Sequence, residues 1–533
     1  MLSQQFPQGS SFNKAATCIE SGDFVQACQI VARIENRDKQ NADDQHLCAI
    51  LYSQAGRFDL AKHAVFRAIT VEPEQAIFWR NLNYFLHASG VAEASLPAAE
   101  RAVLLEPDSP DNLFRLGLTA LNTKHHKAAV RSFEKLLALA PCHPGANLNL
   151  GVAYNDLTRT QEAVARYRRE ASISPREAAS HYNIGNVFML HGRFEDAIEH
   201  YTQASSLGLN TPDSQVTLAL VYLVLGQFDP GWKLYEYRFS SPSYLRTLPR
   251  DPRIVTTRPG FSPERDLTAR VLVWGEQGVG DEVMFGSMLR EFRGWCGKML
   301  VQMDKRLIPL FRRSLPQDVE FYERGSVVSE DLYDSHIPIG SLGLHLRPSR
   351  ESFEGHRGAY LKADADRVRA LRESFGLTDG ERLIGVSWRS SNPETGAGRS
   401  LPLWELAQVL GGEDRRLVNL QYGSVQEEIA EAQARCGIRV EQVPGVDCQN
   451  DLDGLAALIM ACDEVVSIGN ATAHLAGALG QKTTVLLPYS PSWRWMAKGD
   501  ESPWYRSVRL VRQPARDDWR SVTRRVRDVA SSN

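Results

Sequence analysis

Small, aromatic and apolar residues recur every 34 positions through the first half of the chain. The series comprise prolines (Pro73, Pro107, Pro141, Pro175), glycines (Gly117, Gly151, Gly185), alanines (Ala129, Ala163, Ala197), aromatic residues (Tyr154, Phe188, Tyr222) and further glycines (Gly22, Gly56, Gly90, Gly192, Gly226). Repeats of this length are typical of two helices joined by a turn, with small residues where the helices cross and a proline closing the second helix. We therefore predict an all-α array over residues 1–238.

Residues 181–208, HYNIGNVFMLHGRFEDAIEHYTQASSLG, show the whole pattern. This pattern closely resembles the tetratricopeptide repeat, with about six units between roughly residues 10 and 210 and a capping half-unit at residues 216–239. Such arrays stack into a superhelix whose concave groove holds polypeptides, so the resemblance implies a protein partner. The alternative is an array that only supports its neighbour or mediates self-association.

Asparagines recur in the predicted first helices of the repeats. They are Asn112, Asn147, Asn149, Asn183 and Asn186. Side-chain amides donate and accept hydrogen bonds, so they can hold an extended peptide by its backbone, whatever the peptide sequence. We take them as candidate acceptor-binding residues, and the alternative for each is a solvated or capping residue.

A different pattern begins after residue 238. Five prolines (Pro242, Pro249, Pro252, Pro259, Pro263) interrupt residues 239–268, which predicts an ordered connector. From residue 269, short β-branched runs at 271–274, 299–303, 319–322, 383–388, 416–421, 465–468, 483–487 and 508–511 alternate with helical stretches at 282–295, 363–375, 402–410, 425–436, 452–461, 471–479 and 516–530. Such alternation predicts parallel, doubly wound sheets.

The second half is long enough for two such sheets. We predict Rossmann-like halves at residues 269–375 and 376–515, with the arginine-rich residues 360–377 as a bridge and a C-terminal helix within 516–533. A ligand cleft is expected near the carboxyl ends of the strands. The fold class is therefore multidomain, with an all-α superhelix before an α/β region.

Composition narrows the classes of function. The 533 residues carry 61 basic and 64 acidic side chains, so no global positive field attracts nucleic acid, and we expect no nucleic-acid partner. The N-terminus lacks the apolar core of a signal peptide and the longest apolar run, at residues 218–225, is too short to span a bilayer. We therefore expect a cytoplasmic protein without a membrane span. The eight cysteines show no zinc-type spacing, so no metal is expected.

Residues 271–285, VLVWGEQGVGDEVMF, join a predicted strand to a glycine-rich turn that carries acids and no cation. Three further segments accompany this turn: SWRSSNPETGAGRSLPLWEL (387–406), the segment from DLDGLAALIM to TTVLLP (451–488) and YSPSWRWMAKGDESPWYRSVRLVRQ (489–513). Together, the four segments resemble the heptosyltransferase-like glycosyltransferases. The likeness is greatest to the bacterial subgroup in which tetratricopeptide repeats precede that domain. It implies a metal-independent GT-B enzyme that uses a nucleotide sugar as its donor and needs no further cofactor. The order of repeats before a GT-B domain is also similar to that of protein O-glycosyltransferases.

The acidic turn is the candidate for the acceptor side. Sugar transfer needs a base for the acceptor hydroxyl, and the matching acid of heptosyltransferases, which corresponds to Asp281, is their proposed catalytic base. Gly278 and Gly280 would let the acceptor approach closely. Asp281 could instead cap its helix, because Asp is a preferred N-cap. Glu276 is a second candidate base.

The donor side is expected in the other half. Gly469, Asn470, Ala471, Thr472 and His474 follow a strand and open a helix, where free N–H groups and the helix dipole bind anions. His474 is a candidate donor to phosphate or sugar, and the alternative is a structural histidine. The further donor-binding candidates are Arg389, Ser390, Arg399 and Ser400 for the phosphate and Gln421 and Tyr422 for the base, with Trp493, Arg494 and Trp495 as a lid or core.

One position departs from the family pattern. Heptosyltransferases usually carry Asp where this chain has Gly469, and the loss of a negative charge suits an acidic sugar better than a neutral heptose. Relatives with repeats include enzymes implicated in decorating flagellin with nonulosonic acids such as pseudaminic acid, which arrive as CMP conjugates. The resemblance thus favours transfer from a CMP-nonulosonic acid to Ser or Thr of a protein such as flagellin. The alternatives are a lipopolysaccharide or other glycan acceptor, or a non-catalytic adaptor.

Overall fold

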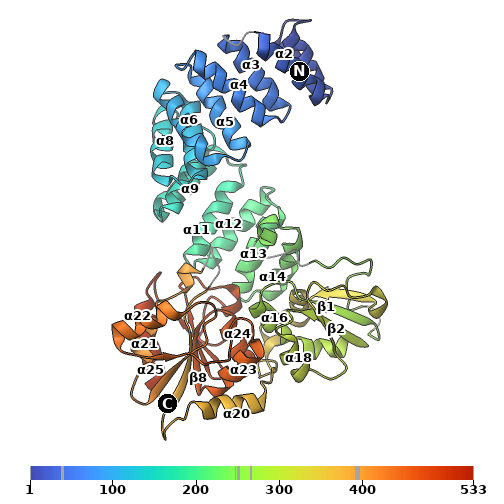
Figure 1. Ribbon diagram of the computed structural model, residues 1–533, viewed down its shortest axis with the longest axis vertical. Coiled ribbons are helices and arrows are strands. Elements are labelled where there is room, and N and C mark those ends of the chain that lie inside the picture. The colour runs from blue at the N-terminus through green and yellow to red at the C-terminus, as the bar shows by residue number, and fades with distance from the viewer. Residues whose placement is uncertain are drawn as a thin grey trace. The chain divides into compact units, whose positions relative to one another are not determined.

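The computed structural model describes residues 2–37, 41–246, 248, 253–264, 267–390 and 396–531. Two compact units are present, one of Met1–Val187 with Gln203–Gly208 and one of Phe188–Thr202 with Leu209–Asn533. The first consists of helices, and the second contains parallel sheets (Figure 1). The predicted order of an all-α array before an α/β region is confirmed.

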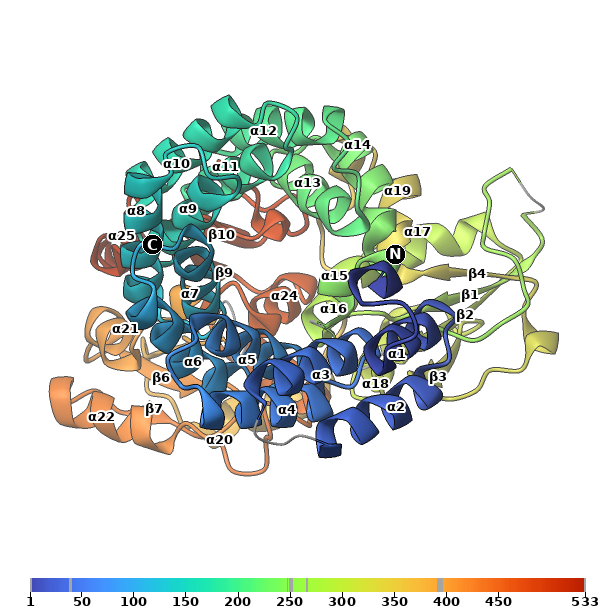
Figure 2. The same cartoon turned by 90° about the horizontal axis from the view of Figure 1, so that it is seen from above.

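Helices of the repeats follow one another in antiparallel pairs. The pairs are α1 (Ser11–Glu20) with α2 (Phe24–Arg37), α3 (Ala42–Gln54) with α4 (Phe58–Val71), α5 (Ala76–Ala88) with α6 (Ala92–Leu105), α7 (Pro110–Asn122) with α8 (His126–Leu139), α9 (Ala146–Asp156) with α10 (Thr160–Ile173), α11 (Ala179–Leu190) with α12 (Phe194–Ser206), and α13 (Pro212–Val224) with α14 (Phe228–Tyr235). Figure 2 shows α1 to α10 side by side along a curve.

The 34-residue spacing has two physical causes in the structure. Every turn between paired helices holds one residue in the left-handed region, with φ from 59° to 80°, at Gly22, Gly56, Gly90, Lys124, Thr158, Gly192 and Gly226. Glycine adopts this conformation without a Cβ penalty. At the helix crossings, a Cβ on Gly117 or Gly151 would lie 2.5 Å from the ring of Phe133 or Tyr167. The aromatic residue that fills each of these crossings therefore belongs to the second helix and lies outside the predicted aromatic series.

Two parallel sheets form the second unit. The first has the order β3-β2-β1-β4, from β1 (Arg270–Trp274), β2 (Lys298–Met303), β3 (Glu320–Glu323) and β4 (Ser335–Pro338). The second has the order β10-β9-β8-β5-β6-β7, from β5 (Arg382–Ser387), β6 (Arg415–Asn419), β7 (Val440–Glu441), β8 (Glu464–Ile468), β9 (Thr483–Leu487) and β10 (Val508–Arg512). Every predicted strand has a counterpart. The sequence did not indicate β4, which ends on a proline, or β7, which has two residues.

Helices cover both faces of the second sheet. On one face α21 (Leu403–Leu410), α22 (Gln426–Cys436) and α25 (Trp519–Ser531) share one apolar cluster with the strands. On the other face lie α23 (Leu452–Ala461) and α24 (Ala471–Ala478) (Figure 1). The helices of the first sheet are α16 (Val279–Gly286), α17 (Leu289–Phe292), α18 (Ile308–Ser314) and α19 (Leu342–Leu346). The single helix predicted at 282–295 is thus divided at Ser287 and Met288.

The predicted bridge contains α20 (Ala365–Ser374), which lies against α23. Arg372 on α20 pairs with Asp463 at 2.9 Å, just before β8. The predicted connector begins with α15 (Pro242–Arg246) and follows the first sheet, where Phe261 N–H donates to the His336 carbonyl on β4. Pro249 and Pro252 lie outside the described residues.

The last helical pair packs in the same compact unit as the sheets, although the repeat pattern continues to residue 238. The indole N–H of Trp232 on α14 donates to the Arg347 carbonyl at 2.8 Å. Arg238, in the 3₁₀ helix η2 (Glu236–Ser240), is fully buried and forms a two-pronged ion pair with Glu276, with N–O distances of 2.7 and 2.8 Å. Its remaining N–H groups reach the Tyr235 carbonyl, Glu236 and Ser341.

Glu276→Gln is expected to destabilise the second unit by about 3 kcal/mol, because it removes the buried two-pronged partner of Arg238 and leaves only the partly exposed Glu236 to compensate that charge. Urea unfolding followed by tryptophan fluorescence measures this, since Trp79 is the only tryptophan before residue 232. The control is Lys233→Ala, which removes an exposed pair with Asp229 and should leave the unfolding midpoint unchanged. Equal midpoints for Glu276→Gln and wild type would contradict the structural role of Glu276.

Candidate functional site

The N-terminal ends of α16 and α24 meet in the second unit. Each helix directly follows a parallel strand, α16 after β1 and α24 after β8. A Cβ at Gly280 would lie 3.2 Å from Ala471 Cα and 3.2 Å from His474 Cδ2. The structure therefore brings the acidic turn and the predicted anion-binding turn together, and a side chain at position 280 would make tight contacts with the α24 turn.

Asp281 pairs with Arg494 across this contact. Arg494, in the 3₁₀ helix η8 (Trp493–Trp495), places its Nε 2.5 Å from Asp281 Oδ1, and the two side chains are 22% and 18% exposed. The helix-capping alternative for Asp281 is not seen, because Gly278 occupies the N-cap position of α16 and no side chain caps it. Asp281 thus presents a partly exposed carboxylate beside a cation. Sequence reasoning did not assign this pairing to Arg494, and no local pattern indicates it.

His474 is buried at the start of α24. Its ring stacks on Trp495 with centroids 4.6 Å apart, and its Nδ1 lies 3.0 Å from the Tyr505 hydroxyl. Burial, followed by the charge of Arg494, lowers the pKa of His474 to about 3. The imidazole is therefore neutral at physiological pH, and it adds no positive charge to the helix end.

The indole of Trp495 fills the space beside Gly469. A Cβ at Gly469 would lie 2.6 Å from Trp495 Nε1, so this packing requires glycine at position 469. Trp495 is 1% exposed, and its N–H has no hydrogen-bond partner within the described part of the chain. A buried N–H donor without a partner is costly, so this indole is a strained element of the turn.

The remaining residues of the α24 turn divide into two groups. Asn470 caps α24 through the Ala473 N–H and donates to Ser387 Oγ at 2.7 Å, which ties the turn to β5. Thr472 is buried, with its hydroxyl directed to the Leu420 carbonyl. Gly469 and Ala471 are partly exposed. A ligand can therefore reach the backbone of the turn, whereas the Asn470 and Thr472 side chains hold its shape.

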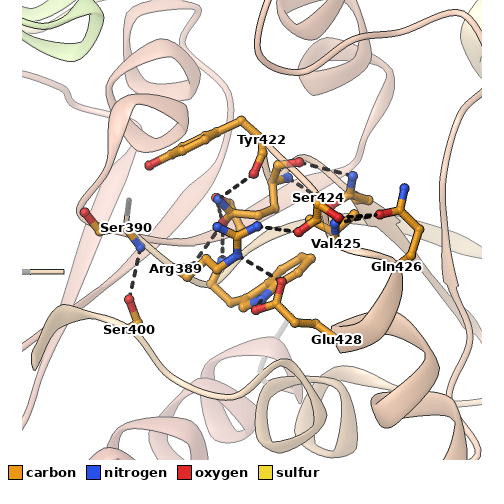
Figure 3. A network of polar contacts seen from close by, with 12 residues as sticks. Arg389, Ser390, Ser400, Tyr422, Ser424, Val425, Gln426 and Glu428 are labelled. Atoms are coloured by element: carbon orange, nitrogen blue, oxygen red, sulfur yellow. Dashed lines mark hydrogen bonds and ion pairs between the residues drawn. The ribbon is translucent and has the colours of Figure 1, made fainter. Parts of the chain in front are cut away.

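The two predicted phosphate-binding arginines differ in their surroundings. Arg389 pairs with Glu428 at 2.9 Å and donates to the Ser424 carbonyl at 2.7 Å, so its charge is compensated (Figure 3). Arg399 ends the 3₁₀ helix η7 (Ala397–Arg399). Burial, followed by the charge of Arg494, lowers the pKa of Arg399, and no carboxylate among the described residues pairs with it. Of these two arginines, Arg399 is the one whose charge no carboxylate among the described residues compensates, so it can bind an anionic ligand.

The other predicted donor-binding side chains shape the loop after β5. Gln421 is buried, and its Oε1 accepts hydrogen bonds from Ser387, Trp388 and Arg389. Because this oxygen is already occupied, Gln421 is not available to bind a nucleotide base. The Ser390 N–H donates to Ser400 Oγ, and the Ser400 hydroxyl donates to the Gly396 carbonyl (Figure 3). The ring of Tyr422 extends away from this network (Figure 3).

The remaining acceptor-side predictions have mixed outcomes. Both oxygens of buried Glu276 bind Arg238, and Oε1 also accepts from the Gly340 N–H, so Glu276 is not available as a base. Gly278 is exposed, as expected for a turn that meets an acceptor. In the repeats, Asn112 and Asn147 are each 1% exposed, which removes them from any surface that a peptide reaches in this structure.

The other asparagines are more accessible. Asn149 is partly exposed but donates to the Gly145 carbonyl of its own helix at 2.8 Å. Asn183 and Asn186 are partly exposed as well. Their side chains are accessible to a bound peptide, so these two asparagines remain candidates for acceptor binding.

A cavity of about 560 Å³ lies at the carboxyl edge of the first sheet. Charged residues at or directly after the carboxyl ends of β2 and β3 line it, namely Asp304, Lys305, Arg306, Glu323 and Arg324, together with Gln277 from the acidic turn. Arg324 binds the fully buried Glu282 at 2.7 Å, and burial raises the pKa of Glu282 to about 7. The sequence analysis did not identify this cluster, although charged residues directly after predicted parallel strands indicate a ligand site at the carboxyl edge of a sheet.

Two searches of the described residues bear on other classes of function. In the part of the chain that the structure describes, no helix combines the length and apolarity needed to cross a membrane. Residues 2–531, apart from the stretches left undescribed, bring no three His, Cys, Asp or Glu side chains together in a way that could hold a metal ion.

Comparisons with known proteins gave a match to a repeat family and a curated relative. The tetratricopeptide repeat family profile matches residues 114–178 and 150–208. Protein FlbA of Caulobacter vibrioides (strain ATCC 19089 / CIP 103742 / CB 15) is 34% identical over 326 residues, which are 57% of this chain and 53% of that protein. This chain therefore spans about half the length of the curated relative that it matches.

Two solved structures were found with limited similarity to part of this chain. The crystal structure of YrrB, a TPR protein with an unusual peptide-binding site, is 16% identical and covers 34% of this chain and 93% of that chain, with a TM-score of 0.31. The crystal structure of PilW, a widely conserved type IV pilus biogenesis factor, is 18% identical and covers 38% and 97%, with a TM-score of 0.34. The profile match shows that the N-terminal helical region of this chain contains tetratricopeptide repeats.

Proposed function

We propose that the second unit is a GT-B glycosyltransferase, which transfers a sugar from a nucleotide-activated donor to a hydroxyl of a protein that the repeats hold. The observation that carries the proposal is the meeting of a carboxylate, Asp281, with an anion-binding helix end at Gly280. Sugar transfer needs these two groups near each other, because the attacked carbon lies between the acceptor hydroxyl and the departing phosphate.

Asp281 is the base in this proposal. Its carboxylate takes the proton of the acceptor hydroxyl while that oxygen forms a bond to the anomeric carbon. The bond from this carbon to the phosphate oxygen breaks, and its electron pair leaves with the nucleotide. Backbone N–H groups at the start of α24 donate to the phosphate as its charge grows. Arg494, whose Nε lies 2.5 Å from Asp281 Oδ1, stabilises the negative charge of this carboxylate.

The charges around α24 support an acidic donor. Arg399 has no carboxylate partner among the described residues, and Arg494 has one, Asp281. The N–H of Trp495, which has no hydrogen-bond partner among the described residues, lies beside Gly469. A hydrogen-bond donor therefore stands where an Asp would provide a hydrogen-bond acceptor. This excess of cations and N–H donors favours a sugar that carries its own carboxylate. We therefore favour a CMP-nonulosonic acid, such as CMP-pseudaminic acid, as the donor.

The first unit supplies a surface for the acceptor protein. An apolar cavity of about 400 Å³ lies among α4, α5 and α6, lined by Phe66, Trp79, Leu82, Leu86 and Val91 among others. Phe66 is 57% exposed, although it is a large apolar side chain. Exposed aromatic residues at a hollow are typical of protein-binding surfaces. We propose that this surface holds the acceptor, with flagellin as the favoured candidate.

Asp281→Asn is expected to lower sugar transfer by about 10²- to 10⁴-fold, because the amide cannot accept the hydroxyl proton. The size and hydrogen-bonding geometry of the side chain are retained, so the dissociation constant for the donor nucleotide should remain within about two-fold. Transfer to purified acceptor is measured with each candidate nucleotide sugar. Asp229→Asn, an exposed substitution on α14, serves as the control. Transfer by Asp281→Asn at the wild-type rate would place the base elsewhere.

Phe66→Ser is expected to raise the KM for the protein acceptor about ten-fold, which corresponds to about 1.4 kcal/mol of lost binding. Steady-state transfer assays with varied acceptor concentration measure this change, and the KM for the nucleotide sugar should not change. Val71→Ser provides a matched control, since Val71 is an exposed apolar residue on the same helix that does not line the cavity. If Phe66→Ser and Val71→Ser had the same KM for the protein acceptor, the cavity would have no role in acceptor binding.

A further inference from the structure

The last pair of repeat helices packs against η8. The Ala497 N–H, just after η8, donates to the Val224 carbonyl at the end of α13, at 2.8 Å. The ring of Trp493 lies against Trp232 and Tyr235 of α14, with centroids 5.5 and 5.9 Å apart. These contacts lie within one compact unit, so α13 and α14 hold the backbone of η8 in place.

A pair of hydrogen bonds ties the Arg494 side chain to α14. Arg494 Nη2 donates to Gln277 Oε1 at 3.3 Å, and Gln277 Nε2 donates to the Tyr235 hydroxyl at 2.7 Å. A guanidinium only donates, so the amide oxygen of Gln277 must meet Arg494, which leaves the amide nitrogen for Tyr235. Gln277 and Tyr235 are 5% and 1% exposed, so both bonds are sheltered from water. The guanidinium is therefore fixed from α14 through Gln277.

The two carboxylate oxygens of Asp281 have different surroundings. Oδ1 accepts from Arg494 Nε at 2.5 Å. Oδ2 lies 3.8 Å from the position that a Cβ on the exposed Gly278 would occupy, and none of the described residues donates a hydrogen bond to it. Because a carboxylate is planar, a fixed Oδ1 also restricts the direction of Oδ2.

We propose that Tyr235 and Gln277 are positioning residues for Asp281. They hold Arg494 on Oδ1, so that Oδ2 stays on the side of the exposed Gly278 and takes the proton of the acceptor hydroxyl. This assignment rests on the proposed function, in which Asp281 is the base. It gives the last pair of repeat helices a role in the geometry of the site, besides closing the repeat array. Displacement of a reacting group by about 1 Å can lower a rate by about 100-fold, so loss of this support has a measurable effect.

Exchange of the Arg494 Nε–H with water measures this support without turnover. The full chain is labelled with ¹⁵N-arginine, and Arg494→Lys identifies the Nε–H signal. Tyr235→Phe removes only the hydroxyl, and Gln277→Met replaces the amide by an apolar side chain of similar length. Each is expected to speed the exchange about ten-fold, as the loss of one supporting hydrogen bond would. Tyr154→Phe, which removes a buried hydroxyl from α9, should leave the exchange rate unchanged.

Wild-type exchange in Tyr235→Phe or in Gln277→Met would overturn the positioning role, and so would an equal acceleration in Tyr154→Phe. Because exchange needs no substrate, this failure is distinguishable from failure of the proposed function, which Asp281→Asn tests.

Steady-state kinetics show whether the support serves the reaction. Tyr235→Phe and Gln277→Met should each lower kcat about ten-fold and leave the KM of both substrates within about two-fold, because they act on the base and not on substrate binding. The double variant should fall no further than the single variants, since both act through Arg494. Additive losses or an unchanged kcat would overturn the proposal, whereas absence of transfer by wild type would contradict the proposed function.

Discussion

The close approach of α16 to α24 at Gly280 is the constraint on which the rest of the candidate site depends. Both helices begin at this contact, and the first backbone N–H groups of a helix have no partner within it. The positive ends of two helix dipoles therefore lie close to each other. Asp281, in the first turn of α16, offsets that charge and binds Arg494 from the other side. A larger residue at position 280 would make tight contacts with Ala471 and His474 at this helix end.

Burial determines which charges remain available near this contact. His474 is neutral because burial and Arg494 lower its pKa, and Arg389 is compensated by Glu428. Glu276 is occupied by Arg238, which joins the last repeat helices to the turn after β1. Arg494 has the Asp281 carboxylate as its partner, whereas Arg399 and the Trp495 N–H have no acidic partner among the described residues. This imbalance is the electrostatic basis for proposing an anionic ligand.

Local rules were enough to predict the repeats, most strands and the two turns. The 34-residue series reflects a left-handed turn residue and a helix crossing, which depend on neighbours within one repeat. The functional residues depended instead on contacts between distant segments. Nothing near Glu276 in sequence indicates Arg238 as its partner, and nothing near Gly469 indicates that Trp495 fills its space. Gln421 follows β6, where a base-binding residue could lie, yet three donors at the end of β5, from Ser387, Trp388 and Arg389, bind its oxygen.

Calorimetric titration with nucleotides tests most directly whether the α24 end binds an anionic donor. CMP, UDP, GDP and ADP are titrated into wild type, Arg399→Gln and Arg389→Gln. The proposed site predicts that one of these nucleotides binds, and that Arg399→Gln weakens binding about ten-fold, which is about 1.4 kcal/mol. Arg389→Gln should change the dissociation constant by less than about two-fold, because Glu428 already compensates that charge. Absence of binding for every nucleotide, or equal losses in the two variants, would contradict the site.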